Sequence, residues 1–124
     1  MKLGNLVQDQ WVEGAGDGRV LTSAVTGEPV ATLSSDGVDF KAMLEHAKKV
    51  GGANLRRMTF HERGFMLKDL AIYLNERKQE FYELSTQTGA TKRDSWPDID
   101  GGISTVFVFS SKARREMPND HVYL

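Results

Sequence analysis

The spacing of apolar residues changes near residue 36. Up to that point, short β-branched and aromatic runs alternate with glycine, which predicts strands and turns over residues 1–36. Gln10–Glu13 and Arg19–Ala24 are expected to pair as a β-hairpin around a glycine-rich loop. A turn then leads into a short strand at Val30–Leu33.

Beyond residue 36 the apolar period becomes about 3.6, which predicts about four helices over residues 37–117. Pro118 is expected to stop the last helix, and residues 118–124 to begin an extended segment. The predicted class is therefore an α+β segment. The first helix is expected to end at Gly51–Gly52, and the second to begin at a capping box formed by Thr59–Glu62. A break at Asn75–Lys78 precedes a third helix that is expected to end at Gly89. The fourth is expected to begin at Asp94, with Pro97 in its first turn.

Composition excludes several classes of function. The 124 residues include 16 Lys and Arg against 17 Asp and Glu, a net charge of −1, so no field of one sign attracts nucleic acid or an anionic membrane. The chain has no cysteine, which excludes thiolate chemistry within it. No apolar run is long enough to span a bilayer, so we expect a soluble, cytoplasmic protein.

Two short motifs suggest sites but favour local structure. The loop Gly14–Gly18 lacks the third glycine of a dinucleotide-binding fingerprint, since Arg19 stands there, and a strand is expected to follow; it is interpreted as a hairpin loop. His61-Glu62 is not a metalloprotease motif, because Phe65 occupies the place of the second histidine, and it is interpreted as part of a capping box.

The remaining candidates form no active site. Asp98 and Asp100 could hold a cation or cap a helix, and capping is favoured. Ser104 and Ser110 lack a nucleophile elbow and are expected to face the core. No catalytic, cofactor-binding or metal-binding residue is assigned. The three histidines (His46, His61, His121) have no ligand spacing, and the basic pairs (Lys48-Lys49, Arg56-Arg57, Lys112–Arg115) are interpreted as solvated helix faces.

Several short stretches nevertheless carry a family resemblance. Gln10-Trp11, the turn Thr26-Gly27-Glu28, the helix start Glu62-Arg63 and the run Thr86–Gly89 occur in an order and at a spacing that resemble the N-terminal part of aldehyde dehydrogenases. The likeness covers essentially the whole chain. It implies that this segment belongs to a larger α/β fold.

Within that family the chain is most similar to the aldehyde dehydrogenase domain of the ring-opening enzyme of phenylacetate degradation. A semialdehyde dehydrogenase of benzoate oxidation shares part of the pattern. The similarity implies oxidation of a CoA-linked semialdehyde to the carboxylate. The stretches that carry it are Leu55–Arg63, Leu84–Thr91, Asp94–Trp96 and Asp98–Ile103.

The resemblance also sets expectations for what lies outside this chain. The family uses a cysteine nucleophile, a glutamate that activates water, and NAD or NADP, all expected in other parts of the fold. The segment is then not catalytic by itself, and its partners are the rest of the dehydrogenase chain and further copies in a homo-oligomer. The alternative is a free-standing interaction module without catalytic activity.

Overall fold

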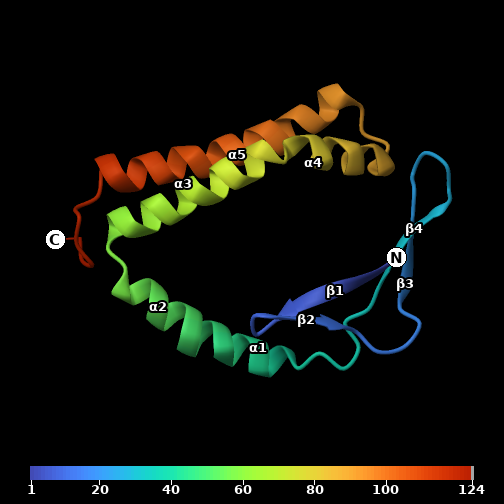
Figure 1. Cartoon of the computed structure of the whole chain (residues 1–124), viewed down its shortest axis with the longest axis horizontal. Coiled ribbons are helices and arrows are strands. Elements are labelled where there is room, and N and C mark those ends of the chain that lie inside the picture. Colours follow the sequence, from blue (N-terminus) through green and yellow to red (C-terminus); the bar gives the residue numbers. More distant parts are fainter. Residues whose placement is uncertain (124) are drawn as a thin grey trace. The chain divides into compact units, whose positions relative to one another are not determined.

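The computed structural model describes residues 1–123, and these form two compact units (Figure 1). The first unit comprises residues 1–52 together with 87–89, and the second comprises residues 53–86 and those from 90 onward. A four-stranded mixed sheet precedes the helices, so the predicted α+β class is confirmed. None of the helices within residues 1–123 combines the length and the apolar character needed to cross a bilayer.

The sheet consists of β1 (Lys2–Val7), β2 (Gln10–Glu13), β3 (Arg19–Thr22) and β4 (Pro29–Leu33) in the order β2-β1-β4-β3. β1 pairs antiparallel with β2 and parallel with β4, and β3 pairs antiparallel with β4. The predicted hairpin between the second and third strands is therefore wrong, because these two strands lie at opposite edges of the sheet.

The N-terminal hairpin is instead formed by β1 and β2. Gln8 and Asp9 connect these strands with positive φ angles of 50° and 66°, the left-handed conformation that a two-residue hairpin turn requires. Neither residue is glycine, so the turn lacks its usual sequence signal. The alternating exposure along Lys2–Val7 identifies β1 as a half-buried strand.

The glycine-rich loop has a packing role. A Cβ atom on Gly14 would lie 2.2 Å from the carbonyl oxygen of Ser34, so no other residue fits without moving the backbone. The loop is held there by the Ser34 hydroxyl, which donates to the carbonyl of Ala15 at 2.7 Å. A strand follows the loop, as expected.

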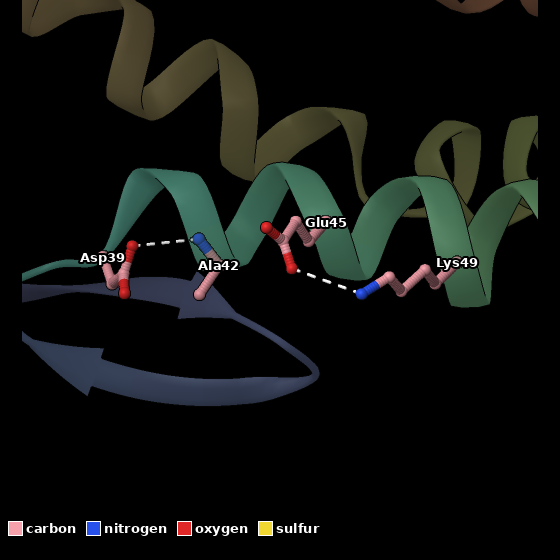
Figure 2. A network of polar contacts seen from close by, with 4 residues as sticks. All are labelled: Asp39, Ala42, Glu45 and Lys49. Carbon is pink, nitrogen blue, oxygen red and sulfur yellow. Dashed lines mark hydrogen bonds and ion pairs between the residues drawn. The ribbon is translucent and has the colours of Figure 1, made fainter.

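The first helical stretch comprises α1 (Phe40–His46), the π-helical segment η1 (Ala47–Gly51) and α2 (Gly52–Arg57). Figure 2 shows its polar contacts: the Asp39 carboxylate accepts from the Ala42 amide at 2.9 Å, and Lys49 pairs with Glu45 at 3.3 Å. The predicted helix end at Gly51–Gly52 is wrong, since Gly52 keeps right-handed helical angles and begins α2.

Helix α3 (Phe60–Glu76) begins at the predicted capping box. The Thr59 amide donates to the Glu62 carboxylate at 2.7 Å, and the Glu62 amide donates to the Thr59 hydroxyl at 3.2 Å. The segment after the last helix returns to this point, where the Phe60 amide donates to the carbonyl of Asp120 at 3.0 Å. Residues 118–123 contain no strand, and Leu124 lies outside the described residues.

After the predicted break come α4 (Lys78–Ser85), the 3-10 turn η2 (Thr86–Thr88), Gly89 in the left-handed conformation, and α5 (Lys92–Arg115). Helix α5 starts two residues before the predicted Asp94, because Thr91 is its N-cap and Asp94 completes a second capping box. Pro97 is consequently inside the helix rather than in its first turn, where it has no amide to reach the carbonyl of Arg93.

Helices α3 and α5 lie side by side (Figure 1) and form the core of the second unit. Their seam is narrow. A Cβ atom on Gly64 would lie 3.1 Å from the side chain of Ala113 and from the carbonyl oxygen of Ser110. Ala71, Ile103 and Ser110 are buried along the same two helices. Small residues thus allow the two backbones to approach closely.

Glycine-to-alanine variants should separate packing from helix propensity. Gly102→Ala should raise the free energy of unfolding by about 0.5–1 kcal/mol, because nothing lies within 4 Å of its added Cβ and alanine is the better helix former. Gly64→Ala should lower it by about 1 kcal/mol or more through overpacking. Urea denaturation followed by circular dichroism measures both. Equal stabilisation by the two substitutions would contradict the narrow seam.

Candidate functional site

The strongest polar cluster of the second unit joins α4 to α5. The Lys78 ammonium donates to one carboxylate oxygen of Asp100 at 2.7 Å, and the Tyr82 hydroxyl donates to the other. Lys78 and Tyr82 are four residues apart on α4 and therefore lie on the same helix face. Both oxygens of the Asp100 carboxylate are thereby engaged.

The contacts shift two pKa values in opposite directions. The hydrogen bond from Lys78 lowers the pKa of Asp100 below its ordinary value, and the bond from Tyr82 acts in the same direction. The hydrogen bond to Asp100, together with burial and the carboxylate charge, raises the pKa of Tyr82 to about 12. At neutral pH the carboxylate is ionised and the phenol is protonated.

This protonation pattern assigns the cluster a structural role. An ionised carboxylate with a lowered pKa is a poor general acid, and a phenol with a raised pKa is a poor general base. The cluster fixes α4 against α5. The expectation that Asp98 and Asp100 cap a helix is wrong, since Thr91 and Asp94 form the cap and Asp100 lies in the third turn of α5.

An open cleft shares Tyr82 with this cluster. It has a volume of about 420 Å³ and is lined by Tyr82, Lys92, Arg93 and Trp96. A smaller hollow of about 170 Å³, lined in part by Glu83 and Ser95, shares Tyr82 and Lys92 with it. The Lys92 ammonium lies 5.9 Å from the centre of the Tyr82 ring. We refer to the larger space as the Trp96 cleft.

Hydrogen bonds fix the position of Ser95, which lines the smaller hollow. Ser95 is 2% exposed, and its hydroxyl lies 2.8 Å from the Ser85 hydroxyl and donates to the carbonyl of Thr91 at 3.0 Å. Asp94 hydrogen bonds to Thr91, which lowers the pKa of its carboxyl group. Sequence reasoning missed the cleft because its residues belong to two helices. For the Asp100 cluster, the spacing of Lys78 and Tyr82 was the available signal.

The other candidate residues are dispersed. The His61 ring nitrogen Nε2 lies 2.9 Å from the carbonyl oxygen of Met117, and that of His46 lies 3.4 Å from Asp9. Ser110 is buried as predicted, whereas Ser104 is exposed, so its expected core position is wrong. Within residues 1–123 no group of three His, Cys, Asp or Glu side chains could hold a metal ion.

The glycine-rich loop does not fit a nicotinamide dinucleotide. The backbone of Ser34 occupies the space beside Gly14, and a Cβ atom on Gly18 would lie 2.6 Å from the carbonyl oxygen of Leu33. The loop also leads into strand β3, whereas a phosphate-binding turn leads into a helix. These glycines allow the loop to pack closely against the end of strand β4.

Comparison with known proteins gives two matches. The model of the aldehyde dehydrogenase family matches residues 11–122. The chain is also 45% identical over 107 residues to 3,4-dehydroadipyl-CoA semialdehyde dehydrogenase from Aromatoleum evansii, a match that covers 86% of this chain and 21% of that protein. The chain thus spans about a fifth of the length of this relative.

The Asp100 cluster predicts an abnormal tyrosine titration. One of the three tyrosines should ionise near pH 12, and Asp100→Asn should return that ionisation toward the ordinary value of 10.0. Ultraviolet absorbance measures phenolate formation. Asp98→Asn, which alters an exposed neighbour, is the matched control and should leave the titration unchanged.

The same cluster sets a pH window for stability. Because the folded pKa of Asp100 is lowered, its contribution is present above the unfolded value of 3.8 and is lost as the pH falls through the folded value. Because the folded pKa of Tyr82 is raised, its contribution is present below pH 10.0 and is lost as the pH rises toward about 12. If Asp100→Asn left the tyrosine titration unchanged, the result would contradict the hydrogen bond between Tyr82 and Asp100.

Proposed function

Because the chain belongs to the aldehyde dehydrogenase family, we propose that it is the N-terminal part of an NAD(P)-dependent enzyme that oxidises a CoA-linked semialdehyde to the carboxylate. The observation that carries this proposal is the 45% identity to an enzyme named for a CoA-linked semialdehyde. The proposed setting is phenylacetate-type degradation of aromatic compounds. NAD or NADP is then bound outside this chain.

The proposed role of this segment is structural. The family mechanism needs a thiolate nucleophile, and the chain has no cysteine. The Asp100 cluster holds two helices together, and both oxygens of its carboxylate are used in doing so. The segment therefore influences the reaction by positioning other parts of the enzyme.

The amount of exposed surface supports this role. The chain exposes 9263 Å², whereas two separate compact units of about half its mass would expose roughly 8000 Å² in total. Among the described residues the buried apolar side chains are those of Ala31, Ala71 and Ile103, a very small core. Large apolar side chains such as Phe65 and Phe109 are half exposed or more.

A groove between α3 and α5 supports the proposal that another part of the enzyme packs on these helices. It has a volume of about 360 Å³ and an apolar lining that includes Phe60, Leu67 and Phe109. Arg63 lines the same groove, and its buried Nε has no hydrogen-bond acceptor among residues 1–123. An acceptor on the remainder of the enzyme would accept a hydrogen bond from this Nε, while apolar side chains fill the groove.

A chimeric enzyme tests the proposed function. The segment of the Aromatoleum evansii enzyme that aligns with this chain is replaced by the chain itself. The chimera should be soluble, keep its oligomeric state and reduce NAD or NADP when supplied with the CoA-linked semialdehyde. Size-exclusion chromatography and absorbance of the reduced cofactor measure both properties.

Two controls define the outcome. Deletion of the aligned segment should abolish soluble, assembled enzyme, and the isolated chain should give no reduced cofactor because it has no thiol. Sustained turnover by the isolated chain would contradict the proposal. An enzyme that keeps its assembly and its rate after the deletion would contradict the structural role and favour a free-standing interaction module.

A further inference from the structure

The Trp96 cleft brings two kinds of recognition group together at its rim. Trp96 is an aromatic side chain that is 62% exposed. Lys92 and Arg93, which precede it on the same helix, are also exposed, and neither forms an ion pair with another of residues 1–123. An exposed aromatic face beside two exposed cations is an arrangement that binds a planar base linked to phosphate.

Among the described residues, those that line the Trp96 cleft include no carboxylate, although the charge of Lys92 contributes to the lowered pKa of Asp100. Asp100 is engaged by Lys78 and Tyr82, and Asp94 is engaged by the capping hydrogen bonds to Thr91. Glu83 lines the smaller adjoining hollow together with Lys92, and it does not line the Trp96 cleft. A phosphate group would therefore be directed to the end of the cleft at Lys92 and Arg93.

The cleft is also held open by fixed elements. The Thr91–Asp94 capping box sets the first turn of α5, and the contact between the hydroxyls of Ser85 and Ser95 ties that turn to α4. Tyr82 cannot swing into the cleft without breaking its hydrogen bond to Asp100. The site is thus largely formed before a ligand arrives, which reduces the entropy lost on binding.

We propose that the Trp96 cleft binds the phosphorylated adenosine end of the CoA-linked substrate, with the adenine stacked on Trp96 and the phosphates held by Lys92 and Arg93. This inference rests on the proposed function, because CoA is the part of that substrate that carries a phosphorylated adenosine. It assigns the segment a substrate-binding role in addition to its structural one. NAD and NADP also contain phosphorylated adenosine, so the test must separate the two sources.

Kinetics of the chimeric enzyme provide that test. The substrate is supplied either as the CoA thioester or as the corresponding pantetheine thioester, which has the same reacting end and lacks the nucleotide. Trp96→Ala should raise KM for the CoA thioester roughly tenfold, the loss of one stacked base. Lys92→Gln combined with Arg93→Gln should also raise it, increasingly at low ionic strength. The effect should be confined to the CoA thioester.

Matched controls are available in the same chain. Arg56→Gln combined with Arg57→Gln removes two exposed charges outside the cleft, and Trp11→Phe alters the other tryptophan, which is 76% exposed. Both controls should leave the ratio of the two KM values unchanged. Equal changes for both thioesters, or no change in any cleft variant, would overturn the proposal.

Direct binding keeps the two proposals distinguishable. If the chimera is inactive, titration of CoA into it still measures the cleft when the quenching of tryptophan fluorescence is compared between the Trp11→Phe chimera and the same chimera carrying Trp96→Phe. Saturable quenching that is lost in the Lys92 and Arg93 variant supports the inference even where the proposed function fails. Quenching by NADP but not by CoA, or a cleft variant that changes KM only for the cofactor, would overturn it.

Discussion

The close approach of α3 and α5 at Gly64 is the contact on which the second unit depends. Glycine at this position lets the backbone of α3 lie against Ala113 and the carbonyl of Ser110, and the buried side chains nearby are correspondingly small. The Asp100 cluster then fixes α4 on the flank of α5, and the segment after α5 returns to the start of α3. These polar ties compensate in part for a seam that buries few apolar atoms.

A narrow seam has a consequence for the rest of the surface. When two helices are held together by small residues, their large apolar side chains are left exposed. Phe65, Trp96 and Phe109 are examples. A small core contributes little hydrophobic stabilisation against the conformational entropy of folding. The proposed remainder of the enzyme would supply the missing burial, and the Trp96 cleft would be the part of this surface used for the substrate.

The sequence predicts most boundaries that depend on local chemistry. The capping box at Thr59 and the left-handed end at Gly89 are confirmed because a side chain or a missing Cβ decides them within one turn. Strand pairing was mispredicted because glycine content suggested a hairpin at residues 14–18, while the actual turn at Gln8 and Asp9 uses residues that rarely adopt positive φ. Asp100 was given the wrong role and the Trp96 cleft was missed because the residues involved lie on two helices, and only the packing of α4 on α5 brings them together.

Hydrogen–deuterium exchange tests the central claim most directly, namely that the exposed faces of α3 and α5 are covered by the rest of an enzyme. The amides of both helices would be compared in the isolated chain and in the chimeric enzyme under identical conditions. The account predicts rapid exchange in the isolated chain and strong protection in the chimera, together with loss of dye binding to the apolar faces. Equal, strong protection in both proteins would contradict it, because the segment would then be a self-sufficient domain.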